Sequence, residues 1–184
     1  MVIGVDEVGR GSWAGPVCVA AVAWPDSAPT KGLGDSKQLS VLRRQKMSRI
    51  IRQYAAYIGI GWVHAAEIDK IGLSAALKQA AQQAVAQIGQ DIPIIVDGRD
   101  KLLGDIPATY IIKADAKVPA VMAASIIAKV ARDAYMAAID SQFAVYGFAK
   151  HVGYGTAMHR QAIAVFGPCE HHRLSYAPLK QFAT

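Results

Sequence analysis

Acidic residues stand at three points in this sequence where short apolar runs end. Asp6 with Glu7, then Asp97, then Asp115 each follow such a run, and the runs predict β-strands. Because neighbouring strands lie about 4.8 Å apart, carboxylates at adjacent strand ends can converge at the rim of a sheet. Clustered carboxylates repel one another unless a cation neutralises them. We therefore expect these four side chains to bind Mg²⁺ or Mn²⁺, which prefer hard oxygen ligands.

A divalent metal site of this kind predicts phosphodiester hydrolysis, since two ions about 3.5–4 Å apart can activate water and stabilise the leaving oxygen. A simpler alternative is that the acids are ordinary turn residues or helix caps. Asp97 precedes Gly98, which is a common turn pair, and Asp115 could cap a helix that begins near Pro119. Spacing alone leaves both alternatives open.

The first acidic pair raises a geometric problem. Neighbouring residues of a regular strand point to opposite faces, so Asp6 and Glu7 would face apart. Both can serve one site only if the strand ends there, and Gly9 suggests that it does.

The elements that must position these acids follow from hydrophobic periodicity. Strands are expected at 2–5, 17–24, 57–63, 92–96 and 109–113, and helices at 40–54, 65–88 (with a break near Gly72), 119–139 and 157–166. This order predicts an α/β fold with a mixed sheet. We expect one domain over residues 1–184, with 141–184 as a helical and loop extension on the core.

Composition places the chain among globular proteins with basic surfaces. It has 184 residues, 53% of them hydrophobic, and 20 Lys and Arg against 14 Asp and Glu, a formal net charge of +6. A basic surface favours polyanionic partners, although charge alone does not identify one. The sequence has no run of the roughly 18 apolar residues that span a bilayer. It has no basic leader before Asp6 either, so we expect a cytoplasmic protein.

The cysteines do not predict a structural metal site. Cys18 and Cys169 form no CxxC pair, and in the cytoplasm we expect them to be reduced. Cys169, Glu170, His171 and His172 lack a second spaced pair of ligands, so we expect no zinc site.

Six blocks of the sequence resemble, in order, the signature of the type 2 ribonucleases H, and specifically the ribonuclease HII family. The blocks are DEVGRGSWAGPV at 6–17, DSKQL at 35–39, DG at 97–98, the stretch 113–133, GFAKHVGYGT at 147–156 with His159 after it, and HRLSY at 172–176. They cover nearly the whole chain.

The resemblance implies a ribonuclease H-like fold, with a central mixed five-stranded sheet flanked by helices. It implies an endonuclease that hydrolyses the RNA strand of RNA–DNA hybrids. Such an enzyme also nicks duplex DNA 5′ of a single ribonucleotide and leaves 3′-hydroxyl and 5′-phosphate ends. The implied roles are ribonucleotide and primer removal in DNA replication and repair. The family's metal ligands, for two Mn²⁺ or Mg²⁺ ions, correspond to Asp6, Glu7, Asp97 and Asp115.

The resemblance also assigns substrate contacts. Gly9, Arg10 and Gly11 match residues that contact the ribonucleotide's 2′-hydroxyl and the adjacent backbone, and Tyr154 matches a tyrosine that stacks on the sugar at the RNA–DNA junction. Glycines allow close approach of the backbone, and arginine can bind phosphate. Without the resemblance, the first three would be a hairpin turn and Tyr154 a half-buried aromatic.

Further substrate contacts are expected from basic and polar residues in the matching blocks. Lys37, Lys129 and Arg132 are candidates to contact phosphates, and Ser125 is a further candidate to contact the substrate. For Lys129, the alternative is an ion pair with Asp133 one helical turn away.

Three histidines lie in the closing blocks. His151, His159 and His172 could assist near the metal ions. The alternative is that they are surface residues or structural histidines whose hydrogen bonds are satisfied within the fold.

The chain departs from the family pattern at Ala114, at Val118 with Pro119, at Val152 and near Gly72. None of these departures removes a metal ligand, so they affect substrate affinity rather than the reaction.

The expected partners are RNA–DNA hybrids and ribonucleotide-containing duplex DNA. We expect a monomer, and find no sliding-clamp-binding box and no room for the N-terminal domain of ribonuclease HIII. The alternative function is a non-catalytic hybrid-binding protein with the same fold. The four acids argue against it, because binding alone gains nothing from negative charge near phosphates.

Overall fold

The computed structural model describes residues 1–34, 36 and 39–183. Its elements in chain order are β1 (Val2–Val8), β2 (Val17–Trp24), α1 (Val41–Tyr54), β3 (Tyr57–Val63), α2 (Ala65–Ile71), α3 (Leu73–Ala86), β4 (Ile94–Asp97), β5 (Thr109–Ile111), the 3-10 turn η1 (Ala114–Ala116), α4 (Pro119–Asp140), α5 (Phe148–His151), α6 (Ala157–Phe166) and the 3-10 segment η2 (Ala177–Phe182).

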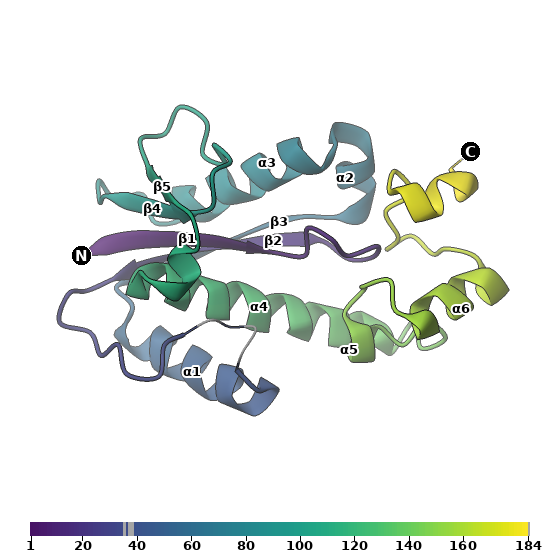
Figure 1. The fold of residues 1–184 in the computed structure, drawn as a ribbon, viewed down its shortest axis with the longest axis horizontal. Helices are drawn as coiled ribbons and strands as arrows, with labels where there is room; N and C mark the ends of the chain where they lie inside the picture. The colour runs from purple at the N-terminus through teal and green to yellow at the C-terminus, as the bar shows by residue number, and fades with distance from the viewer. Residues whose placement is uncertain (35, 37–38, 184) are drawn as a thin grey trace.

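The strands form one sheet in the order β3-β2-β1-β4-β5. β2 runs antiparallel to β1 and β3, whereas β4 runs parallel to β1 and β5. Figure 1 shows the sheet between two helical layers, with α2 and α3 on one face and α4 and α1 on the other. The predicted mixed five-stranded sheet is confirmed.

Two apolar clusters hold these layers together. One lies between the sheet and α3, and the other lies between the sheet, α4 and α1. β2 is buried along its whole length, as expected for a strand covered on both faces. The strand glycine Gly4 lets α4 lie directly on β1, because a Cβ added there would be 2.1 Å from the carbonyl carbon of Ala120.

The predicted break near Gly72 is confirmed, since α2 ends at Ile71 and α3 begins at Leu73. Other boundaries differ from the prediction for reasons that local sequence does not reveal. β5 ends at Ile111 rather than 113, because Lys113 adopts a left-handed conformation (φ 58°) that starts η1. β1 is longer than predicted, and its pairing with β2 continues as far as Val8.

The C-terminal part forms a third apolar cluster at one end of the sheet. There α5, α6 and η2 pack around the end of α4 and around Ala14, which lies in the turn between β1 and β2 (Figure 1). Among the helices that the structure describes, none is long and apolar enough to cross a membrane.

Candidate active site

Parallel pairing of β1 and β4 brings two of the predicted acids together. Val5 pairs with Val96, so Asp6 and Asp97 follow at the same level on neighbouring strands. Asp6 is only 6% exposed. It lies on the face of β1 that α4 covers, and Ser125 of α4 hydrogen-bonds its carboxylate. The Oγ atom of Ser125 also lies 2.8 Å from that of Ser36.

The third acid, Asp97, is oriented by η1. Its Oδ1 accepts the backbone N–H of Ala114 at 2.6 Å and that of Asp115 at 3.5 Å. These bonds bring the mostly buried Asp115 next to Asp97, as the sequence predicted. Asp97 therefore lies next to β1, which carries Asp6, and is hydrogen-bonded to η1, which carries Asp115.

Glu7 reaches the site from a different direction. The prediction that the strand ends at the first acidic pair is wrong, because β1 stays paired through Val8, so Asp6 and Glu7 alternate in direction. Both nevertheless line the same hollow, so an ending strand is not required for them to share a site. The Glu7 carboxylate lies 3.3 Å from Arg10 Nη1, and Arg10 Nη2 lies 2.9 Å from Asp100.

The carboxylates concentrate negative charge in a poorly hydrated place. Burial raises the pKa of Asp6 well above its usual range, and the charges of Glu7 and Asp97 raise it further. Burial also raises the pKa of Glu7, an effect that the nearby Arg10 opposes. A divalent cation would offset this charge, and the ligand oxygens are of the type that Mg²⁺ and Mn²⁺ prefer. Within the described part of the chain, however, no three acidic, histidine or cysteine side chains are already arranged to hold a metal ion.

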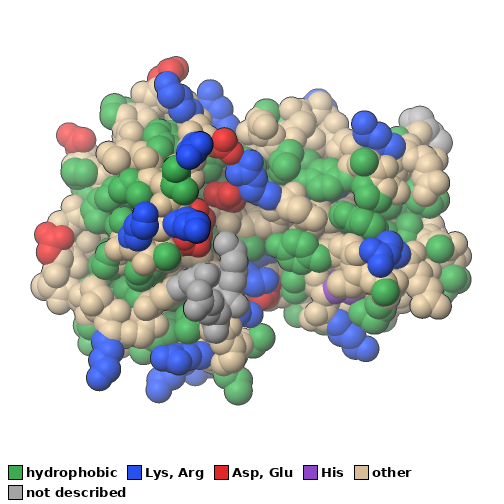
Figure 2. Space-filling view, viewed as in Figure 1, with side chains coloured by type: hydrophobic (Ala, Val, Ile, Leu, Met, Phe, Trp, Pro, Cys, Tyr) green, Lys and Arg blue, Asp and Glu red, His purple; other side chains and the backbone are tan. Residues whose placement is uncertain are grey.

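Two of the acids, Asp6 and Glu7, open onto a hollow of about 270 Å³. It is lined by Asp6, Glu7, Val8, Ser36, Arg44, Ser125, Lys129 and Tyr154. Figure 2 shows acidic side chains in the middle of this face with Lys and Arg side chains around them. A phosphate backbone could therefore approach the carboxylates between cations.

The predicted glycine–arginine–glycine turn follows β1 directly. Gly9 has a positive φ of 93°, and a Cβ there would be 2.4 Å from Arg132 Nε, so only glycine fits. The Arg10 side chain is 46% exposed. A Cβ on Gly11 would be 4.0 Å from the ring of Tyr154, which is itself 38% exposed. The turn and the predicted stacking residue are therefore neighbours.

Arg132 does not fit its predicted role. Its side chain is fully buried, and its guanidinium donates to the carbonyls of Pro16 (2.9 Å), Val152 (2.9 Å) and Ala14 (3.0 Å). The prediction that Arg132 contacts phosphate is wrong, because these carbonyls occupy its donors. The side chain instead holds the turn between β1 and β2.

The other predicted contacts have different outcomes. Lys129 pairs with Asp133 at 2.7 Å, which was the alternative, but it also lines the hollow, so its contact with phosphate stays a prediction. Ser125 already bonds Ser36 and Asp6, so its contact with substrate stays a prediction as well. Lys37 lies outside the described residues.

The three histidines form a buried cluster apart from the carboxylates, packed around Phe148. His159 hydrogen-bonds the carbonyl of Tyr154 through Nδ1 (3.0 Å) and His172 through Nε2 (3.0 Å). His151 Nε2 lies 2.7 Å from the carbonyl of Tyr146. Burial lowers the pKa of His159 and of His172 to about 4. These are satisfied structural histidines, in keeping with the alternative stated from sequence.

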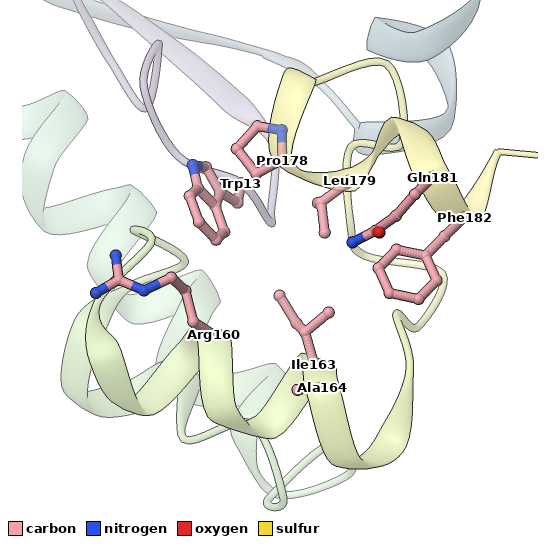
Figure 3. A pocket seen from close by; sticks show the side chains of 8 residues that line it. All are labelled: Trp13, Arg160, Ile163, Ala164, Pro178, Leu179, Gln181 and Phe182. Atoms are coloured by element: carbon pink, nitrogen blue, oxygen red, sulfur yellow. The ribbon is translucent and has the colours of Figure 1, made fainter.

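A separate apolar hollow of about 200 Å³ lies beyond the turn. In Figure 3, Trp13 faces Pro178 and Leu179 of η2, with Ile163 of α6 opposite them. None of the described residues that line this hollow is acidic, so it is not an extension of the carboxylate site. It shows that η2 packs against the turn that follows β1.

Sequence reasoning missed the residues that hold this turn from the C-terminal side. Arg173 donates to the carbonyls of Gly9 (2.7 Å) and Gly15 (2.9 Å) and is fully buried. Its block at 172–176 is part of the family resemblance, but no local pattern distinguishes a buried arginine from a surface one.

Together, the sheet order and the acids at the ends of its parallel strands define an α/β nuclease with the ribonuclease H fold. A sequence model of the family Ribonuclease HII matches residues 3–179. The chain is 44% identical over 185 residues to Ribonuclease HII of Halorhodospira halophila, covering 98% of this chain and 93% of that protein. The chain belongs to the ribonuclease HII family, and it is therefore an endonuclease of the ribonuclease H class.

Solved structures agree on the fold. The chain is similar to a structure described as the PCNA:RNase HII complex from Archaeoglobus fulgidus, with a TM-score of 0.82 and 26% identity over 100% of this chain and 97% of that one. It also shares its fold with Bst-RNase HIII, solved in complex with Mn²⁺, with a TM-score of 0.74 and 21% identity over 98% of this chain and 68% of that one.

Proposed function

We propose that this enzyme hydrolyses the RNA strand of RNA–DNA hybrids and nicks duplex DNA 5′ of single ribonucleotides, leaving 3′-hydroxyl and 5′-phosphate ends. Its cellular role would be the removal of ribonucleotides and primers from DNA in the cytoplasm. The observation that carries this proposal is the position of Asp6 and Asp97. They lie in register on parallel strands and beside Asp115, and Asp6 shares a hollow with Tyr154.

The proposed metal ligands are Asp6, Glu7, Asp97 and Asp115, with two Mg²⁺ or Mn²⁺ ions during catalysis. When bound, such ions supply an activated water and stabilise the leaving oxygen. The protein's own contribution is to fix its carboxylates. The amides of η1 orient Asp97 and the hydroxyl of Ser125 orients Asp6, so two of the proposed ligands are held in place by the fold.

The proposed substrate contacts lie on the turn that follows β1 and on the neighbouring Tyr154. Arg10 is an exposed cation next to Glu7 and suits a phosphate of the cut strand. The backbone of Gly9 and Gly11 would meet the 2′-hydroxyl, the group that separates RNA from DNA. Tyr154 offers an exposed ring next to this turn and would stack on the sugar at the junction.

The test uses a DNA duplex with one ribonucleotide, incubated with Mg²⁺, with Mn²⁺ and with EDTA. We expect a nick 5′ of the ribonucleotide with either metal and none with EDTA. The variant Asp97→Asn should lose cleavage while keeping the wild-type melting temperature. Its control is Asp91→Asn, an exposed acid that precedes β4 at the opposite end from Asp97. Absence of a metal-dependent nick, or full activity in Asp97→Asn, would refute the proposal.

A further inference from the structure

The glycine–arginine–glycine turn is held from behind by the segment that follows α6. Arg173 Nη1 donates to the carbonyl of Gly9 at 2.7 Å and to that of Arg10 at 3.2 Å. The same nitrogen donates to the hydroxyl of Tyr176 at 2.8 Å, and that hydroxyl donates in turn to the carbonyl of Arg10. Two consecutive carbonyls of the turn therefore point toward residues of the C-terminal segment.

The direction of these carbonyls fixes the direction of two amides. In a planar trans peptide the carbonyl and the following N–H point in opposite directions, and the described chain has no cis peptide. Since the carbonyls of Gly9 and Arg10 face Arg173 and Tyr176, the N–H groups of Arg10 and Gly11 face away from them. Arg10 and Gly11 are both exposed residues, and Gly11 lies next to Tyr154.

Burial makes this orientation hard to reverse. The Arg173 side chain is fully buried, and its hydrogen bonds among the described residues go to backbone carbonyls and to the Tyr176 hydroxyl. A peptide that turned its carbonyl outward would leave a buried cation with fewer partners, which is costly. The cation and the turn therefore stabilise each other.

The holding segment is itself anchored to α2, which follows β3 at the same end of the sheet as the turn. Asp69 of α2 accepts the N–H groups of Leu174 (2.8 Å) and Ser175 (3.0 Å) and the hydroxyl of Ser175 (2.6 Å). Asp69 thus fixes the backbone between Arg173 and Tyr176. It does so without touching the turn.

We propose that Arg173 and Tyr176 are positioning residues for ribose recognition. They aim the N–H groups of Arg10 and Gly11 at the 2′-hydroxyl and the adjacent phosphate of the ribonucleotide. This inference rests on the function proposed above. It adds that selectivity for a ribonucleotide depends on residues that do not themselves touch the substrate.

The experiment measures cleavage of a duplex with one ribonucleotide in Mg²⁺, with the same duplex made wholly of DNA as a competitor. The inhibition constant of the DNA competitor measures binding to the phosphate backbone alone. The kcat/KM for the ribonucleotide-containing duplex depends in addition on recognition of the 2′-hydroxyl. Tyr176→Phe removes one hydroxyl from the carbonyl of Arg10. We expect kcat/KM to fall about fivefold, the contribution of one hydrogen bond. The inhibition constant of the DNA competitor and the melting temperature should stay at wild-type values.

The matched control is Tyr146→Phe, which removes a tyrosine hydroxyl that donates to the carbonyl of Gly167 at 2.9 Å, away from the turn. It should leave kcat/KM unchanged. If Tyr176→Phe does not fold, Asp69→Ala provides the second test and should lower kcat/KM selectively in the same way.

The outcomes separate the two proposals. Wild-type kcat/KM in the folded Tyr176→Phe or Asp69→Ala variant would overturn the positioning role, and so would an equal loss of affinity for both duplexes. A wild-type enzyme that cuts neither a hybrid nor a ribonucleotide-containing duplex would instead refute the proposed function.

Discussion

The buried histidine pair predicts how the enzyme responds to acid. His159 and His172 have a pKa of about 4 in the folded protein, mainly because of burial, against an ordinary value of 6.5. Their folded-state pKa values are lowered, so the unfolded chain binds more protons between these values. Stability is therefore complete above pH 6.5 and is lost as the pH falls toward 4.

The size of the effect follows from the same values. For one such group, linkage gives about 2 kcal/mol between pH 7.5 and pH 5. We halve this because His159 contributes to the lowered pKa of His172, so the two effects do not add in full, which leaves about 2 kcal/mol for both histidines together. The assay is urea unfolding at pH 7.5, 6.5, 5.5 and 5.0, in wild type and in His159→Asn. The asparagine can keep a donor toward the carbonyl of Tyr154 but cannot titrate.

We expect the loss of stability on acidification to be about half as large in His159→Asn as in wild type. The control is His64→Asn, because His64 is exposed at the start of α2 and outside the buried cluster. It should keep the wild-type pH dependence. The reasoning fails if wild-type stability does not change from pH 7.5 to 5.0, or if His159→Asn loses as much stability as wild type.

Three further predictions concern packing and substrate contact. Gly4→Ala should cost about 3 kcal/mol of unfolding free energy, since its Cβ would meet the backbone of α4, whereas Gly34→Ala, with open space around it, should change stability little. Arg132→Met should lower the unfolding free energy by about 3 kcal/mol, because it leaves three backbone carbonyls without their donor. If urea unfolding gives the wild-type stability for this variant, these hydrogen bonds contribute nothing. Tyr154→Ala should lower kcat/KM about tenfold, whereas Tyr154→Phe should keep most activity; equal losses would argue against stacking.

The position of Asp97 at a strand end could be predicted from sequence because it depends on a local pattern. An apolar run that ends in an acid places Asp97 at a strand end wherever the strand lies in the sheet. Placing Asp6 beside it additionally required the parallel pairing of β1 with β4. The length of β1 was not predictable, because Val8 stays in the strand only through its pairing with Cys18 of β2.

The role of Arg132 could not be inferred from its own helix. Its three partners come from the turn before β2 and from Val152, and one of them, Ala14, is 118 residues away in sequence. A helical arginine near Lys129 and Asp133 has the pattern of a solvated face. Only the folded chain shows that backbone carbonyls converge on that side of α4.

The hydrogen bond from Arg173 to Gly9 spans 164 residues of sequence. During synthesis, the strand that carries Asp6 leaves the ribosome long before the residue that steadies the adjacent turn. Arg132 of α4 can hold the carbonyls of Ala14 and Pro16 before that residue is made, but the carbonyls of Gly9 and Arg10 gain the donors Arg173 and Tyr176 only when the C-terminal segment packs against the turn. If Arg173 and Tyr176 position the turn as proposed, the site that reads the 2′-hydroxyl is complete only once the C-terminal segment has packed.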